Sequence, residues 1–578
     1  MKMGVRKLAT IVTILLAVIL WLVSMVIVKK DTDFSCRWVA LAFHYSSFFP
    51  ILTTFIYEQL EDKSWKVVFK KENILQFLFI LLLAAISYFI FLEKYPFVSV
   101  GDELRDNGLL ALQINKGRER NIFGYGAYNG YGLDVSVIAG FFYRLFGSSV
   151  LTYRFPSALL AVVEVVIIYL LGYLILGKTM AFWLAVSLIA LPLQLMLART
   201  EFLVLFNSFL TTATLFLFFF LEDEKVINFA IFGIILGFSF GFHTAARVVA
   251  LIILGIVILL EFFSVSRLNI KKKGLNLLIL ILFCFIGFGP RLLFTKKDVF
   301  FAKDHFYTQF NEQQNFIDKF NKFGERYYHS FLSWMVEPLQ NRTVDNQPIL
   351  TPFLGAFFVV GLVTSLLFWN NLYLKIISFL ALALPFSNSA LTDTLNQGHR
   401  LSVLLPIGAV LVAVGIIVFQ QRMTQKIIRN IFSFFVLVYL LSQIFFFFYH
   451  QPISKSAGLK DYLSMHLIYF LKNHPELASR KICLRVSPTN WQNLDLLHYK
   501  EQYAYFFPDL DIERFADSGV NDDEIFIGTN DNCEQQYLFL PGGEKVLSSA
   551  NNSYNISCAD QKAFICPLGY SGEIKIHY

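Results

Sequence analysis

Long runs of apolar residues, separated by short polar and charged segments, dominate the chain. An α-helix needs about 20 apolar residues to cross a bilayer, so we predict about thirteen membrane-spanning helices. The second span, which contains His44 and several Ser and Thr residues, has the weakest apolar pattern. The first span ends at Val28, and the others cover 37–58, 75–94, 154–176, 179–198, 202–221, 227–242, 246–263, 275–291, 351–369, 372–386, 401–420 and 431–449.

The first apolar run is expected to be retained as a membrane span. MKMGVRK carries the positive charge of a signal peptide, but the following run is about 20 residues long. It ends in KKDTD without a small-residue cleavage site.

Composition supports a membrane protein. Of the 578 residues, 56% are hydrophobic and 16% are charged, and the mean hydropathy is +0.56. A typical soluble domain carries about 25% charged residues. These values exclude a disordered chain and an ordinary cytosolic enzyme. The net charge of +7 does not indicate nucleic-acid binding, because basic residues of membrane proteins collect on the cytoplasmic face.

The positions of the basic residues predict a cytoplasmic N-terminus and an extracytoplasmic C-terminus. With this orientation in a plasma or inner cell membrane, most Lys and Arg clusters lie on the cytoplasmic face, as the positive-inside rule requires. Three long segments then lie outside, at 95–153, 292–350 and 450–578. No GxxxxGK[ST] phosphate loop occurs, so any substrate is expected to arrive already activated.

The segment 450–578 is predicted to form an extracytoplasmic α/β domain, because helical patterns alternate with the strand patterns KICLRVS and DEIFIG. Four cysteines of this segment fit an oxidising exterior, where disulfides persist. We favour the pairs Cys558–Cys566 and Cys483–Cys533, with free thiols as the alternative.

An acidic cluster follows the third predicted span, in the sequence PFVSVGDELRDNG. Asp102 and Glu103 come where the chain leaves the membrane, and Asp106 follows one helical turn after Asp102. Partial desolvation at a membrane boundary raises the pKa of a carboxyl group, which suits a general base. The alternative is a charge pair that complements the N-terminal dipole of a helix.

Several motifs resemble the C-type (GT-C) glycosyltransferases, most closely the group of protein O-mannosyltransferases and lipid A aminoarabinose transferases. The acidic pair after a span is one, and FFYRLFGSSVLTYRFPSAL, with Arg154, is another. ALPLQLMLARTEFLVLF contains an Arg-x-acidic element, Arg199 and Glu201, and GFSFGFHTAARVVALI resembles the next pair of spans. The resemblance is good over about 75–265 and looser to 420.

This resemblance implies an α-helical polytopic membrane protein with GT-C architecture. Residues 1–74 would add two N-terminal transmembrane helices, and 75–449 would form the catalytic transmembrane domain with outer loops 95–153 and 292–350. The implied activity is transfer of a hexose or pentose, for instance mannose, from a polyprenyl-phosphate carrier to a hydroxyl acceptor with inversion. Asp102 would act as base, and Glu103 would orient the acceptor or a cationic partner.

Basic residues at the outer ends of spans are the candidates for binding the donor phosphate, because arginine clamps phosphate oxygens bidentately. They are Arg154, Arg199, Arg247, His399 and Arg400, with Glu201, Asp106 and His243 as further candidates. For each arginine the alternative is an interfacial side chain that snorkels to water or is held by a structural ion pair, and Arg154 could also pair with Asp102 and set its pKa. Glu164, in the middle of the fourth span, is either functional or a neutral hydrogen-bonded acid.

The expected partners are the lipid bilayer, the lipid-linked sugar and a protein or glycan acceptor, with no nucleic acid. No metal-ligand pattern is evident, and the need for a divalent metal stays open. The outer segment 292–350 mixes Phe and Tyr with charges at helical spacing and is expected to form interfacial helices. The alternatives are the same fold acting on a lipid or cell-wall glycan, a transporter or flippase, and a non-catalytic scaffold.

Overall fold

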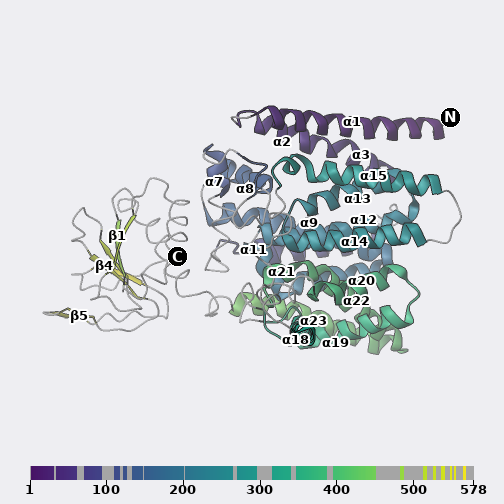
Figure 1. Ribbon diagram of the computed structural model, residues 1–578. Helices are drawn as coiled ribbons and strands as arrows, with labels where there is room; N and C mark the ends of the chain where they lie inside the picture. Colours follow the sequence, from purple (N-terminus) through teal and green to yellow (C-terminus); the bar gives the residue numbers. More distant parts are fainter. Residues whose placement is uncertain are drawn as a thin grey trace.

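The structure is a computed structural model of the whole chain, which is mainly helical up to residue 450 (Figure 1). Besides seven C-terminal strands, the structure describes residues 2–31, 34–61, 71–93, 110–117, 121–125, 133–147, 149–200, 202–263, 270–295, 315–339, 347–386 and 395–450.

Helices coincide with every predicted span, since an apolar run can satisfy its backbone hydrogen bonds in a membrane only within a helix or a closed barrel. The helices of the first part are α1 (Lys2–Lys30), α2 (Arg37–Ser46), α3 (Phe48–Glu61), α5 (Lys71–Phe89), α7 (Leu110–Asn115), α8 (Leu133–Phe146), α9 (Val150–Leu176), α10 (Lys178–Ala190), α11 (Pro192–Thr200) and α12 (Phe202–Phe219). They continue with η3 (Phe220–Asp223), α13 (Val226–Phe240), α14 (Thr244–Phe263), α15 (Ile270–Phe288), η4 (Gly289–Leu293), α18 (Phe316–Leu332), α19 (Pro352–Val363), η7 (Thr364–Phe368), α20 (Leu372–Pro385), α21 (Gly398–Leu401), η9 (Ser402–Leu404), α22 (Leu405–Arg422) and α23 (Lys426–His450).

Fewer helices are long enough to span a membrane than the thirteen spans that were predicted. In the described part of the chain, 8 helices are long and apolar enough to cross a membrane, or up to 9 if one bent pair counts as a span. At 1.5 Å per residue the others fall short of the roughly 30 Å hydrocarbon core. These shorter apolar helices at predicted spans are Asn73–Phe89, Val226–Phe240, Pro352–Phe368 and Leu372–Pro385. The multi-pass character is therefore clear, and the count of thirteen is not confirmed.

The predicted span 179–198 is bent. Helices α10 and α11 meet at 67°, with Pro192 as the first residue of α11. Proline has no backbone N–H and fixes its own φ, so it starts a helix readily and does not continue one. The bend directs α11, which ends in Arg199 and Thr200, away from the axis of α10.

Glycines allow two helix pairs to pack backbone against backbone, which is typical of membrane helices. A Cβ on Gly237 of α13 would collide with the carbonyl of Cys284 in α15, and one on Gly287 would collide with the carbonyl of Ile234. Gly361 of α19 has the same close approach to α22. These contacts fix the distance between the two helices of each pair.

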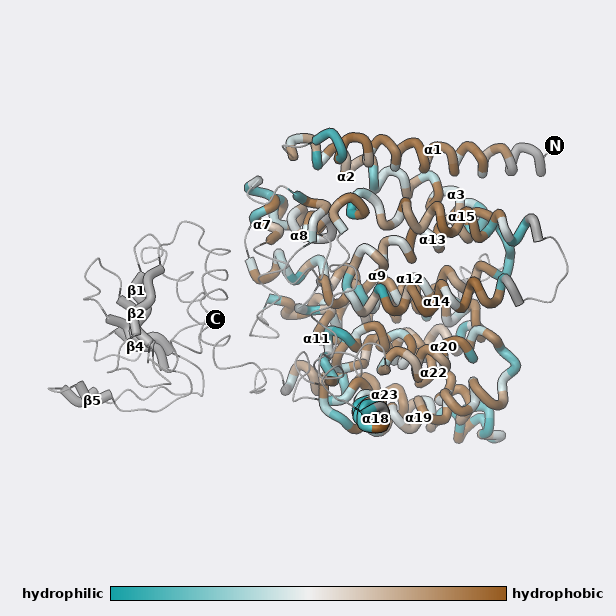
Figure 2. Tube along the Cα trace, viewed as in Figure 1, coloured by the Kyte–Doolittle hydropathy of each residue, from teal (hydrophilic) through white to brown (hydrophobic). Residues whose placement is uncertain are grey.

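The helices lie side by side, with apolar residues along them and hydrophilic residues gathered toward the ends (Figures 1 and 2). Helices α7 and α8 lie at the end of the bundle opposite the N-terminus of α1 (Figure 1). Two loops predicted to share the inner face meet in an ion pair, with Lys272 Nζ 2.7 Å from Glu224 Oε2. The orientation in the membrane stays a prediction.

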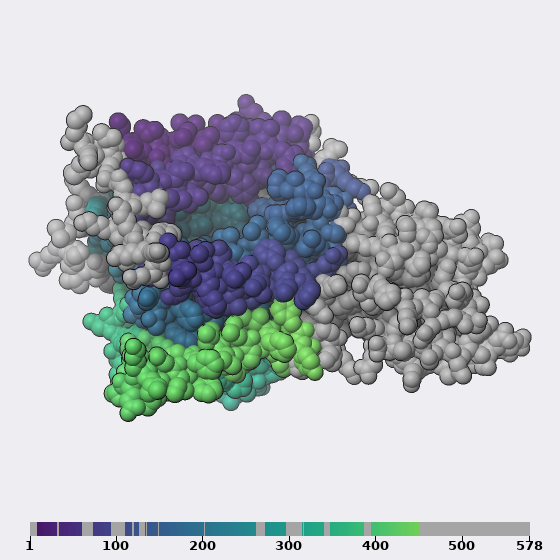
Figure 3. All heavy atoms as spheres, turned by 180° about the vertical axis from the view of Figure 1, so that it is seen from behind, coloured from purple at the N-terminus to yellow at the C-terminus, as the bar shows by residue number. Residues whose placement is uncertain are grey.

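The helices of the predicted N-terminal addition pack on the rest of the bundle. Helix α1 contacts α2, α3 and η4, and α3 contacts α13. Viewed from behind, these N-terminal helices, in purple, and the green helix α23 occupy opposite edges of the helical part (Figure 3).

The C-terminal strands form a five-stranded sheet of order β2-β1-β3-β4-β7 and a separate hairpin, β5-β6. β1 and β3 lie at the two segments predicted as strands, and β1 pairs with β2 in parallel. A parallel pair requires a crossover connection, and a helix was predicted there. That helix and the four cysteine side chains lie outside the described residues, so the α/β class and the disulfides stay predictions. The strands are β1 (Ile482–Val486), β2 (Ile512–Ala516), β3 (Ile525–Gly528), β4 (Gln536–Leu540), β5 (Leu547–Ser549), β6 (Asn552–Tyr554) and β7 (Phe564–Pro567).

Candidate active site

The acidic candidates Asp102, Glu103, Asp106 and Glu201 lie outside the described residues. The structure does describe the segment that leads to the acidic pair. Helix α5 ends at Phe89, and the chain continues in a turn to Glu93. The residues that bind the end of α5 are therefore relevant to the candidate site.

Arg199 caps the end of α5. Its Nη1 donates to the carbonyls of Ser87 at 2.9 Å and Tyr88 at 3.2 Å, and its Nη2 donates to the carbonyl of Ile90 at 2.7 Å. The last carbonyls of a helix have no intrahelical partner, and a cation there also complements the helix dipole. The guanidinium is fully buried and lies 4.9 Å from the Phe448 ring.

Arg154 holds the turn that follows. Its Nη1 donates to the carbonyl of Leu92 at 3.1 Å, and the side chain is fully buried. The structure thus places two predicted phosphate-binding residues, Arg154 and Arg199, on the same short stretch of backbone. Their hydrogen bonds given above go to main-chain carbonyls, and a role toward phosphate stays a prediction.

A second group forms where α12, α14 and α21 meet. His243 Nδ1 lies 3.3 Å from Asn207 Nδ2 and accepts from the backbone N–H of Ala245, also at 3.3 Å. Because Nδ1 accepts, the hydrogen of the neutral ring is assigned to Nε2. The His243 and His399 rings are 5.9 Å apart in an edge-on arrangement. Arg400, next to His399, is half-buried.

Arg247 extends this second group toward the first of the predicted outer loops, 95–153. Its side chain is buried, and its guanidinium carbon lies 5.7 Å from the centroid of the Tyr125 ring. The Tyr125 hydroxyl is 2.8 Å from Thr295 Oγ1, at the start of the second outer segment. We call His243, Arg247, His399 and Arg400, together with Arg291 described next, the cationic cluster, after its three arginines.

Sequence reasoning missed Arg291. It is fully buried in η4, its guanidinium carbon lies 4.5 Å from the centroid of the Phe238 ring, and its Nη1 is 3.5 Å from the Phe238 carbonyl. A Cβ on Gly241 would collide with its guanidinium, so a larger residue there would force the Arg291 side chain to move. Its position at the end of the predicted span 275–291 could have identified Arg291 as a candidate, but the apolar residues around it obscured this signal. Tyr125 gave no such signal.

Glu164 lies in neither group. It is fully buried between α9, α11 and α12 and accepts hydrogen bonds from Gln194 at 3.0 Å, Ser208 at 2.6 Å and Thr212 at 2.9 Å. These bonds fit the interhelical acid that was one of the two predicted alternatives. Through Gln194, Glu164 also ties α9 to the bent helix that carries Arg199.

The described residues contain no group of three or more His, Cys, Asp or Glu side chains that could hold a metal ion. The cationic cluster offers arginine and histidine instead, which are suited to an anion. A metal requirement for the chain stays undecided.

Part of the chain matches a known protein family. Residues 134–294 match the family "Dolichyl-phosphate-mannose-protein mannosyltransferase". The matched segment contains Arg154, Arg199, His243, Arg247 and Arg291. No curated protein sequence is significantly similar to the chain.

Among solved structures, the oligosaccharyltransferase AglB from Archaeoglobus fulgidus, in complex with an inhibitory peptide and a dolichol-phosphate, is similar with a TM-score of 0.42 and 13% identity. The alignment covers 71% of this chain and 59% of AglB, less than two thirds of that protein. ArnT from Cupriavidus metallidurans in the apo state has a TM-score of 0.49 and 11% identity, over 77% of this chain and 86% of ArnT. The same ArnT bound to undecaprenyl phosphate has a TM-score of 0.41 and 12% identity, over 75% of each chain.

The resemblance to the mannosyltransferase group of GT-C glycosyltransferases, predicted from sequence motifs, is confirmed by the family match over residues 134–294.

Proposed function

We propose that the chain is an integral membrane glycosyltransferase that takes a sugar from a polyprenyl-phosphate carrier and transfers it to a hydroxyl acceptor at the outer membrane face. The observation that supports this most is the cationic cluster at the N-terminal end of α14. Three of its residues, His243, Arg247 and Arg291, lie within the segment that matches a family named for a dolichyl-phosphate-mannose donor. A carrier with a polyprenyl tail stays in the bilayer, so its phosphate must meet its binding residues at the ends of spans.

The proposed reaction is a single displacement with inversion. Asp102 removes the proton of the acceptor hydroxyl, and the acceptor oxygen forms a bond to the anomeric carbon of the sugar. The bond from that carbon to the phosphate oxygen breaks, and the electron pair leaves with polyprenyl phosphate. Glu103 orients the acceptor. General-base catalysis of this kind contributes about 10²–10⁴-fold.

The cationic cluster would bind the leaving phosphate, which gains negative charge as the glycosidic bond breaks. Arg247 and the pair His399–Arg400 come from different helices, and the His243 ring contacts that of His399. Buried donors that are already in place stabilise such charge more strongly than water does. Arg154 and Arg199 have a separate task, since they hold the helix end from which the chain runs to Asp102.

A transfer assay with radiolabelled polyprenyl-phosphate mannose and a set of protein and glycan acceptors tests the proposal. The wild-type protein is expected to transfer the label, and Asp102→Asn is expected to lower the rate by about 10²–10⁴-fold while donor binding is retained. Asp318→Asn is the matched control, because Asp318 is an exposed carboxylate in another outer segment. A rate for Asp102→Asn close to that of the wild type would contradict the assignment of the base.

A further inference from the structure

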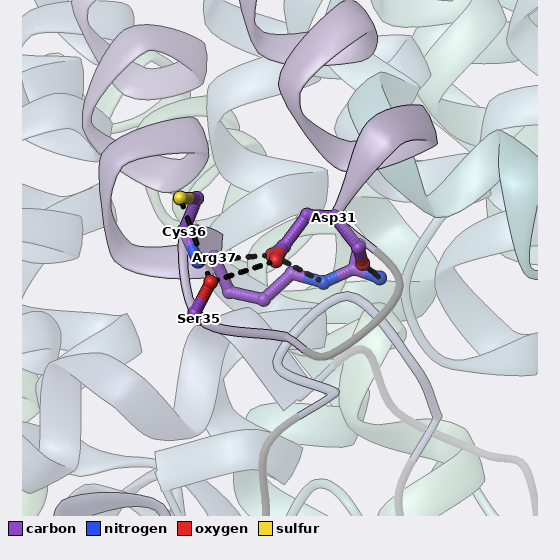
Figure 4. Close-up of polar contacts among 4 residues, drawn as sticks. All are labelled: Asp31, Ser35, Cys36 and Arg37. Carbon is purple, nitrogen blue, oxygen red and sulfur yellow. Dashed lines mark hydrogen bonds and ion pairs between the residues drawn. The ribbon is translucent and has the colours of Figure 1, made fainter.

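The turn between α1 and α2, predicted to lie at the outer face, is built around one buried ion pair (Figure 4). Arg37 Nε lies 3.3 Å from Asp31 Oδ2, and Arg37 Nη2 donates to the Asp31 carbonyl at 3.2 Å. Asp31 also accepts from the backbone N–H of Cys36 at 3.1 Å and from Ser35 Oγ at 3.3 Å. Both charged side chains are about 4% exposed or less. A pair desolvated to this degree requires close partners on every side.

The same arginine reaches the second outer segment. Its guanidinium carbon lies 4.6 Å from the ring centroid of Phe34, within the turn, and 4.9 Å from that of Phe294, just after η4. The backbone N–H of Phe294 donates to the Arg291 carbonyl at 2.9 Å, and Thr295 Oγ1 donates to that carbonyl at 2.9 Å as well. Arg37 therefore contacts the short stretch of chain that positions Arg291.

The hairpin also packs on the first outer loop. Val28, Ala40 and Leu41 form one buried cluster with residues of that loop, namely Ile114, Ile122 and Phe123. Tyr125, the neighbour of Arg247, follows Phe123 by two residues.

His44 makes a third contact. Its fully buried ring lies edge-on to Phe123, with ring centroids 6.4 Å apart, and a Cβ on Gly289 would collide with it. Gly289 has a φ of +65° and precedes Pro290 and Arg291, so this close approach and this backbone conformation both require glycine. The N-terminal helices thus contact the segment that leads to Tyr125 and the segment that carries Arg291.

We infer that the hairpin α1–α2, which lies outside the matched family segment, is a positioning element of the donor site and acts on Arg247 through Arg37. The described contacts run from Arg37 to Phe294, then through Thr295 to Tyr125, and from Tyr125 to Arg247. The inference rests on the proposed function in one respect, the assignment of donor binding to the cationic cluster.

Arg37→Ala tests this role by kinetics. The KM for the polyprenyl-phosphate sugar is expected to rise about 2- to 30-fold, the range for mutations that act through a contact network, with kcat within about twofold. Arg37→Lys keeps the charge beside Asp31 but lacks the flat guanidinium that stacks between two rings, so we expect normal thermal stability and a raised KM. Lys30→Ala is the control, because Lys30 is an exposed cation one residue from Asp31.

Hydrogen exchange provides a readout that needs no transfer activity. Amides of residues 110–115 and 121–125 are expected to exchange faster in Arg37→Ala and at the wild-type rate in Lys30→Ala. Phe294→Leu, which leaves the Asp31 pair intact, is expected to reproduce the effect and replaces Arg37→Ala if that variant does not fold.

Unchanged exchange and unchanged donor KM in both Arg37→Ala and Phe294→Leu would overturn the inference. So would a KM fully restored by Arg37→Lys, because the contact with Phe294 would then be irrelevant. If the wild-type protein transfers no sugar, the proposed function fails, and the exchange rates still decide whether the hairpin positions the first outer loop.

Discussion

Replacing Arg199 with methionine separates the two roles that a buried arginine can have at this membrane boundary. Arg199 donates to the carbonyls of Ser87, Tyr88 and Ile90 at the end of α5. Methionine keeps the length and apolar volume of the side chain but leaves these carbonyls without that donor. A buried acceptor without a partner costs about 1–3 kcal/mol, so the free energy of unfolding should fall by about 3 kcal/mol or more.

The measurements are thermal unfolding in detergent, the transfer rate and the affinity for polyprenyl phosphate. If Arg199 is a helix cap, Tm falls by several degrees and the transfer rate falls with it, because the chain leading to Asp102 loses its anchor, while affinity for polyprenyl phosphate stays within about twofold. Arg429→Met, an exposed arginine on α23, is the control and should match the wild type. A variant with wild-type Tm that no longer binds polyprenyl phosphate would refute the capping role and identify Arg199 as a phosphate ligand.

Three further predictions concern packing, the buried acid and the cationic cluster. Gly237→Leu should lower the free energy of unfolding by at least about 1–3 kcal/mol because its side chain would collide with α15, whereas Gly255→Leu, with open space around it, should be neutral in thermal unfolding. Glu164→Ala should lower the free energy of unfolding by about 2–4 kcal/mol, because three buried donors lose their acceptor. Glu164→Gln should lower it less, since the amide carbonyl still accepts, and thermal unfolding of both variants is the test. His399→Ala should raise the KM for the lipid-linked donor about tenfold, the worth of one charge-assisted hydrogen bond, with unchanged far-UV circular dichroism, and an unchanged KM would remove His399 from the donor site.

The long apolar runs predict where the helices lie, because a membrane permits few other ways to satisfy the backbone. They did not predict the bend at Pro192, whereas the short helices α13 and α20 match the lengths of their predicted spans, 227–242 and 372–386. The close helix contacts at Gly237 and Gly361 were not predicted either, because the apolar runs of one sequence do not show which helices pack together.

The candidate site, like the fold, could be predicted only in part from the sequence. Residues at span ends, such as Arg154 and His243, could be identified as candidates because a charge near lipid is costly and is seldom retained without a use. Their grouping could not be predicted. Arg199 and Arg154 share the end of α5, whereas His243 and His399 meet across α14 and α21, and both groupings join segments far apart in the chain.

The two buried arginines at the end of α5 also bear on how a carboxylate base can work near the membrane. A helix C-terminus carries about half a negative charge, which repels further negative charge nearby. The acidic pair follows Leu92 by only about ten residues, a reach of at most roughly 36 Å. Arg199 on the helix carbonyls and Arg154 on the carbonyl of Leu92 reverse the sign of the local charge. In the proposed mechanism, Arg154 and Arg199 would lower the cost of keeping Asp102 ionised if it lies within roughly 10 Å of them, the distance over which salt screens a charge, and neither would need to touch the substrate.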